Sequence, residues 1–177
     1  TYLDQVYGTP QYMELLSRYP VKGEQKRLLT LVKTKGESGM GRQAASLLES
    51  QGQLHEILNV VEKGQDEERI KAIQSLRGMG AEEVQLFIQR VILSDRYPTE
   101  LRKAAIQTLA GTETGQQRLL QYLDNQQMVS DLKETAILTL SNVWSASIRQ
   151  KAQLHKEGGA ILAKSAMPVI SNLISKK

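Results

Sequence analysis

A repeated pattern of side chains is the feature of this sequence that most constrains its fold. In each of four segments, a basic residue stands three positions before an alanine; the segments are 42–48, 69–76, 102–109 and 133–140. A leucine follows that alanine by four positions in the last three segments and by three in the first. The alanines lie 27, 33 and 31 residues apart, which is typical of solenoids built from two-helix repeats.

The pattern predicts helices that pack closely against one another. An alanine and a leucine four positions apart lie on one face of a helix. The alanine lets a neighbouring helix approach, and the leucine fills the space beyond it. The basic residues fall near the helix starts, where we expect them to pair with an acid of an adjacent repeat or to cap a loop rather than to bind a ligand; they are Arg42, Arg69, Arg102 and Lys133.

Further amphipathic stretches precede these segments. Apolar side chains recur at helical spacing over residues 54–61, 84–92 and 119–123, and two more helices are expected around Tyr12 and Leu28. The predicted fold class is therefore all-α, a right-handed α-α superhelix (HEAT/ARM-like solenoid) of about four to five helical hairpins. Residues 1–157 form the repeat domain. Residues 158–177 form a C-terminal capping or linker segment, which we expect to cover the open end of the solenoid.

Several loop positions are also predicted. Glycines suit the left-handed position after a helix; the candidates are Gly52, Gly64, Gly78, Gly80 and Gly111.

The sequence gives no sign of catalytic chemistry. The chain has no cysteine, which excludes thiolate metal sites and covalent haem attachment within it. Its two histidines, His55 and His155, are one hundred positions apart and not in a zinc-binding spacing. No phosphate loop or nucleophile elbow is present. We therefore predict no catalytic, cofactor-binding or metal-binding residue, and no enzyme.

The charge is unevenly distributed. Residues 148–177 carry a net charge of +5 and the other residues a net charge of −1. The basic end can attract phosphate or an acidic partner, but we favour a solubilising linker. The near-neutral body argues against nucleic-acid binding. No apolar run approaches the roughly 20 residues that span a bilayer.

Trp144 is the only tryptophan and follows the fourth repeat segment. It could serve as the anchor of a protein contact, or it could fill the core where the last repeat meets the C-terminal segment. We favour the core position. If this region does contact a partner, the candidate residues are Trp144, Arg149 and Lys151.

Residues 38–157 resemble HEAT repeats. The stretch 131–152, with Lys133, Ala136, Leu140 and Trp144, is similar to the end of the helical-repeat region in bacterial membrane-bound dehydrogenase-like proteins. Those are large secreted proteins that also carry a c-type haem domain. Residues 41–48 match the first repeat of such regions, and residues 167–173 occupy the place of the linker before the haem domain.

This resemblance implies a non-catalytic scaffold or docking domain of a redox protein in the periplasm or cell envelope. Haem c is then expected in a downstream domain that begins just after Lys177, with no haem-binding residue in this chain. The expected partners are neighbouring domains of the same polypeptide or another protein, with no nucleic acid, membrane span or small-molecule substrate. A free-standing protein–protein adaptor that uses the concave solenoid face is the alternative; a nucleic-acid-binding HEAT-like domain is less favoured.

Overall fold

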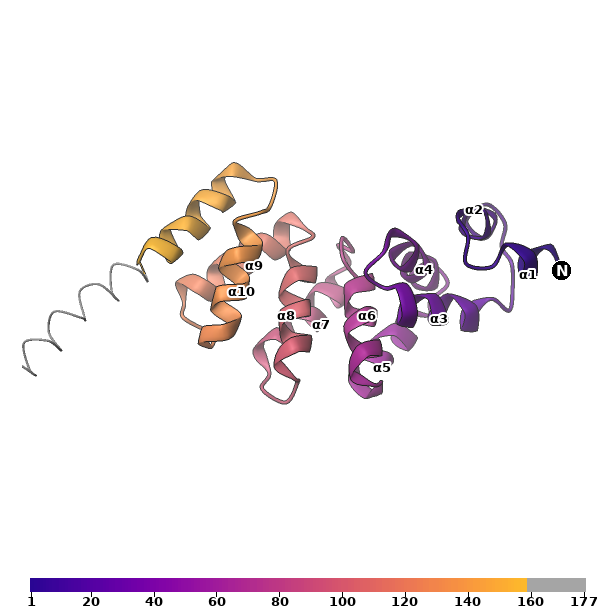
Figure 1. The fold of residues 1–177 in the computed structure, drawn as a ribbon, viewed down its shortest axis with the longest axis horizontal. Helices are drawn as coiled ribbons and strands as arrows, with labels where there is room; N and C mark the ends of the chain where they lie inside the picture. The colour runs from indigo at the N-terminus through magenta and orange to yellow at the C-terminus, as the bar shows by residue number, and fades with distance from the viewer. Residues whose placement is uncertain (159–177) are drawn as a thin grey trace, which may run out of the picture.

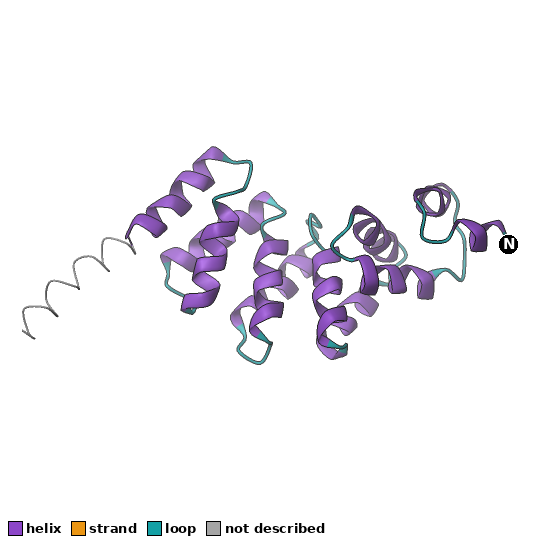
Figure 2. Ribbon diagram, in the orientation of Figure 1, coloured by secondary structure: helices purple, strands orange, loops and turns teal. Residues whose placement is uncertain are grey.

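The computed structural model describes residues 1–158, and the regular structure of this part of the chain is entirely helical (Figures 1 and 2). The predicted capping segment, apart from its first residue, lies outside the described residues. An unlabelled helix over residues 146–158 follows ten labelled ones. These are α1 (Tyr2–Val6), α2 (Pro10–Arg18), α3 (Gln25–Lys35), α4 (Gly39–Ser50), α5 (Leu54–Lys63), α6 (Asp66–Ser75), α7 (Glu82–Leu93), α8 (Thr99–Leu109), α9 (Glu113–Asp124) and α10 (Ser130–Leu140).

The repeated pattern falls on α4, α6, α8 and α10, as predicted. In the last three of these helices, the alanines and leucines of the pattern are fully buried; they are Ala72, Leu76, Ala105, Leu109, Ala136 and Leu140. Burying one leucine side chain contributes about 2 kcal/mol. The alanines leave room for neighbouring backbones, and α8 lies in contact with both α6 and α10.

The helices form an extended row. Helices α5 and α6 pack as one hairpin and α7 and α8 as the next, while α6, α8 and α10 lie side by side along the molecule (Figure 1). The N-terminus is at one end of this row and the 146–158 helix is at the other. Each hairpin therefore touches mainly its neighbours.

Polar side chains also join α5 to α7, α7 to α9 and α9 to the 146–158 helix. Arg90 of α7 pairs with Glu62 of α5 at 3.2 Å. The Tyr122 hydroxyl of α9 donates to Gln89 of α7 at 2.9 Å. His155 of the last helix contacts Asp124 of α9 at 2.7 Å. These bonds fix the spacing of one hairpin against the next.

The first copy of the pattern lies on a helix, α4, that does not continue the row formed by the other three. Helix α3, and not α4, makes the more extensive contact with α6. Lys33 of α3 pairs with Glu68 of α6 at 3.1 Å. Lys71 of α6 donates to Glu37, just after α3, at 2.5 Å, and this hydrogen bond lowers the pKa of that carboxyl.

The start of α4 explains this difference. Ser38 caps α4 by accepting from the Gly41 amide, as Thr112 caps α9 by accepting from the Gly115 amide. The start of α4 thus resembles that of α9, although α4 packs mainly against α3 and little against α5. Two helices, α4 and α5, separate α3 from α6, where one helix separates α6 from α8 and α8 from α10.

Glycines fill two roles in the turns. Gly52 and Gly78 adopt positive φ, as predicted for residues that end a helix. The same prediction is wrong for Gly64, whose φ is −71°, and for Gly80 and Gly111, which do not adopt positive φ either. Gly111 allows a close approach instead, because an added Cβ there would lie 2.6 Å from Cγ of Arg77 on the neighbouring hairpin.

The structural role predicted for the basic residues is confirmed for three of them. Arg69 donates to the Val61 carbonyl at 2.7 Å, and Arg102 donates to the Ile92 carbonyl at 2.9 Å. Both acceptors lie in the last turns of the preceding helix, where carbonyls have no intrahelical partner. Arg42 donates to the Glu37 carbonyl at 3.0 Å, which caps a loop. Lys133 lines a surface groove instead.

Candidate docking surface at the C-terminal hairpin

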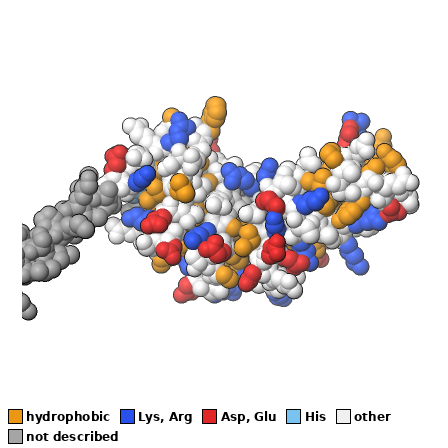
Figure 3. Space-filling view, viewed as in Figure 1, with side chains coloured by type: hydrophobic (Ala, Val, Ile, Leu, Met, Phe, Trp, Pro, Cys, Tyr) orange, Lys and Arg blue, Asp and Glu red, His pale blue; other side chains and the backbone are white. Residues whose placement is uncertain are grey.

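Large apolar side chains are exposed mainly at the two ends of the molecule. Three tyrosines are exposed near the N-terminus, and hydrophobic side chains gather over that end in Figure 3. Four more belong to what we call the last, or C-terminal, hairpin, which consists of α10 with its N-cap, the 146–158 helix and the turn between them. Two lie between the ends of the described chain. The full set is Tyr2, Tyr7, Tyr19, Leu86, Leu93, Val129, Leu138, Trp144 and Leu154. The last hairpin carries the most exposed of them.

Trp144 is 97% exposed, so the predicted core position is wrong. It lies in the turn between α10 and the 146–158 helix, directly before Ser145, whose hydroxyl accepts from the Ile148 amide at 3.4 Å. Beside this turn, Ile148 is buried in the core and Val143 is partly buried against it. The residue directly before the N-cap is a glycine in two earlier turns, Gly80 and Gly111.

Arg149 fixes the backbone of this turn. Its guanidinium donates to the Val143 carbonyl at 2.8 Å and to the Trp144 carbonyl at 2.6 Å. Charge-assisted hydrogen bonds of this kind are stronger than neutral ones. Arg149 therefore positions Trp144 rather than standing as a free contact residue.

The structure does not bring Lys151 to the same surface. Lys151 lines a separate groove with Glu113, Asp124 and Ser147. Of the three candidate contact residues, only Trp144 and Arg149 lie together.

Leu138 is a surface residue that the sequence reasoning missed. It is 68% exposed and lies on α10 between two grooves. One of these grooves contains Trp144, Val143 and Thr139 of the last hairpin together with Arg77 and Gln107 of the preceding ones. The residue five positions after the basic residue of the pattern is Gln74 in α6, Gln107 in α8 and Leu138 in α10. A leucine at a position that is otherwise glutamine could have indicated from the sequence that Leu138 is exposed.

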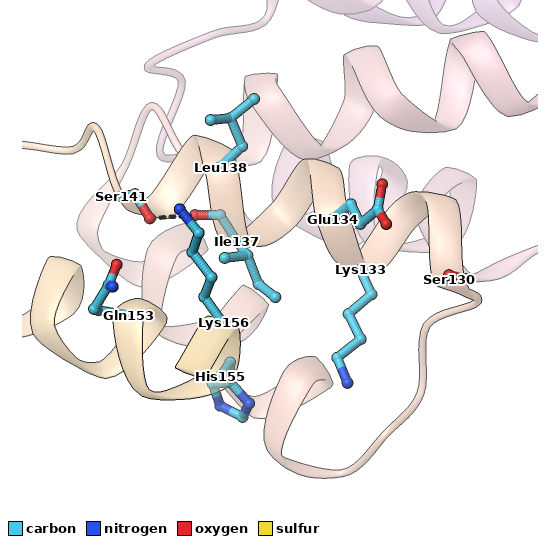
Figure 4. A pocket seen from close by; sticks show the side chains of 9 residues that line it. All are labelled: Ser130, Lys133, Glu134, Ile137, Leu138, Ser141, Gln153, His155 and Lys156. Atoms are coloured by element: carbon cyan, nitrogen blue, oxygen red, sulfur yellow. Dashed lines mark hydrogen bonds between the residues drawn. The ribbon is translucent and has the colours of Figure 1, made fainter. Parts of the chain in front are cut away.

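The second groove lies between α10 and the 146–158 helix (Figure 4). Its volume is about 560 Å³, and α10 lines one side with Lys133, Ile137 and Leu138. Lys156 reaches from the last helix toward Ile137 and Ser141, while Glu134 points away from Lys133. The contact of His155 with Asp124 holds the last helix against α9.

These groups can bind a partner through apolar area, hydrogen bonds and charge. Among residues 1–158, no group of three or more histidine, cysteine, aspartate or glutamate side chains is placed to hold a metal ion. His55 is an exposed surface residue beside Glu56. In the described part of the chain, no helix has the length and apolarity to cross a bilayer.

Comparison with models of known protein families, with curated proteins and with solved structures finds no match for this chain.

Proposed function

We propose that this chain is a non-catalytic docking scaffold whose C-terminal hairpin contacts another protein. In this proposal the hairpins form a HEAT/ARM-like right-handed superhelix that carries the contact surface at its end. The observation that carries the proposal is the 97% exposure of Trp144 beside the exposed Leu138. Tryptophan is enriched among the residues that dominate binding energy at protein interfaces.

Hydrogen bonds to the backbone hold the turn that carries Trp144. Arg149 donates to the carbonyls of Val143 and of Trp144, and Ser145 caps the helix that follows. The turn is ordered before any partner arrives, so binding costs less conformational entropy than ordering a free loop would.

A capture experiment tests this function. The full chain, immobilised, is expected to retain one stoichiometric partner from the source organism, and Trp144→Ala together with Leu138→Ala is expected to abolish the capture. Leu86→Ala, at another exposed leucine on α7, is the matched control and should retain the partner. Capture that is unchanged by the first pair of substitutions contradicts the proposal.

The similarity of residues 131–152 to a dehydrogenase-like repeat region names one partner, a c-type haem domain of the same polypeptide in the cell envelope. This part of the proposal rests on the resemblance alone. The coding sequence after Lys177 tests it, because a Cys-x-x-Cys-His segment is expected there. If the gene lacks that segment, the haem domain is wrong as the partner, but the proposed docking function is unaffected.

A further inference from the structure

We propose that the groove between α10 and the 146–158 helix binds an acidic amphipathic α-helix of a partner protein, laid alongside α10. This inference rests on the proposed docking function and adds the chemistry of the partner. It follows from the position of the groove in the helix row, its apolar floor and the charges at its edges.

The position of the groove is that of the next helix in the row. Helix α6 is covered by α8, and α8 is covered by α10. Four positions after the basic residue of each repeat stand Ile73, Ile106 and Ile137. The first two are fully buried, but Ile137 of α10 is only half-buried and lines the groove. A helix beside α10 would complete the burial that Ile73 and Ile106 already have.

The apolar floor extends beyond this isoleucine. Leu138 follows it directly and is 68% exposed. The helices α6 and α8 have glutamines at the position of Leu138, so the row does not need a leucine there for its own packing. An amphipathic helix presents an apolar stripe of the width that such a floor can cover.

The charges at the edges favour an acidic helix. Lys133 and Lys156 stand at the groove, and Glu134 points away from Lys133 (Figure 4). Arg69 and Arg102, which precede Lys133 in the repeat, are committed to carbonyls of the same chain. Lys133 forms no hydrogen bond or ion pair to another side chain or carbonyl within residues 1–158, so its ammonium is available to a carboxylate of a partner.

The remainder of this chain has the wrong charge for the groove. Residues 159–177 contain three lysines, Lys164, Lys176 and Lys177, and no acidic residue. Like charges across an interface disfavour association. A partner helix rich in glutamate or aspartate therefore fits the groove better than this segment does.

Two stapled synthetic helices serve as probes. Both have a leucine stripe at helical spacing; one has glutamate and the other lysine at the remaining positions. Binding to the full chain is followed by fluorescence polarisation of the labelled peptide at low salt. We expect the glutamate peptide to bind about tenfold more tightly than the lysine peptide, because two lysines face it. The double substitution Lys133→Glu with Lys156→Glu should reverse that preference.

Controls separate this groove from general charge effects and from other occupants. Lys22→Glu with Lys26→Glu, at exposed lysines near the N-terminus, makes the same change in net charge and should leave the preference intact. Equal binding of the two peptides, tighter binding of the lysine peptide, or no binding of either overturns the proposal. A peptide of residues 159–177 that competes as strongly as the glutamate probe, or a dimer of the chain that the Lys133/Lys156 variant loses, also overturns it.

Failure here and failure of the docking function give different results. If capture depends on Trp144 and Leu138 but the acidic peptide does not bind, only the partner chemistry is wrong. If the acidic peptide binds but capture does not depend on Trp144, the proposal for the groove is supported and the proposed contact at Trp144 is contradicted.

Discussion

The interior hairpins and the C-terminal hairpin share one pattern but differ at equivalent positions. In α6 and α8, the isoleucine that follows the basic residue by four is fully buried, and the next position is a glutamine. In α10 the same two positions hold the half-buried Ile137 and the exposed Leu138. The residue before the next N-cap is glycine in the interior turns and Trp144 at the end.

These differences distinguish positions that pack against a neighbouring hairpin from positions that are exposed and open to a partner. At Gly111 the neighbouring hairpin leaves no room for a larger side chain, whereas Gly80 has open space around it. The end has no such neighbour among the described residues, and its substitutions all add apolar area that the hairpin itself does not bury. Exposed apolar area in a contiguous patch is characteristic of interaction sites, and here it coincides with a break in the repeat pattern.

The largest expected contrast is between the two isoleucines. Ile106→Ala should lower the free energy of unfolding by about 2–4 kcal/mol, because it leaves a cavity in a fully packed site. Ile137→Ala should cost about 1 kcal/mol, since that side chain is already half exposed. Urea denaturation followed by circular dichroism measures both. Equal losses would show that Ile137 is as well covered as Ile106.

A smaller contrast is expected between the residues before the two N-caps. Gly111→Ala forces a Cβ to within 2.6 Å of Arg77, so we expect a loss of about 1–3 kcal/mol from overpacking. Trp144→Ala should change the free energy of unfolding by less than about 0.5 kcal/mol, because the indole is exposed. Thermal melts of the two variants compare them. A large loss for Trp144→Ala would contradict its surface position.

The basic residues of the repeat provide the third contrast. Arg102→Met keeps the aliphatic stem but leaves the Ile92 carbonyl without its donor, for an expected loss of about 1–2 kcal/mol. Lys133→Met should cost less than about 0.5 kcal/mol. The same denaturation measurement applies. A comparable loss in both variants would mean that Lys133 also stabilises the fold.

The smallest effect is spectroscopic. With a single tryptophan in the chain, intrinsic emission reports Trp144 alone, and its exposure predicts a red-shifted spectrum that iodide quenches readily. Addition of a bound partner should shift the emission to shorter wavelength. A blue-shifted, unquenched spectrum of the free chain would place the indole in an apolar environment.

Much of the helical structure could be predicted from the sequence because its cause is local. The alanine and leucine spacing defines a buried face of each helix, and Arg69 and Arg102 near helix starts have few roles other than capping. The register of the N-terminal helices was not predictable in this way. Arg42 copies the pattern of Arg69, but only the contact of α3 with α6 shows which helix belongs to the row.

The position of Trp144 was mispredicted for a different reason. Tryptophan is highly buried on average, and the junction of the last repeat with the C-terminal segment was the expected site of that burial. Which of two adjacent residues turns inward depends on the turn geometry that Ser145 and Arg149 impose.

The bonds between successive hairpins have a consequence for how this chain opens. The contacts Arg90–Glu62, Tyr122–Gln89 and His155–Asp124 join residues 28, 33 and 31 positions apart. When each hairpin contacts only its neighbours in the chain, folding can begin in the middle of the row and unfolding can begin at its ends. The 146–158 helix and α10 are the last described helices of this row. A ligand bound against them would slow amide exchange at this end first, so its binding would be measurable there as a local gain in order.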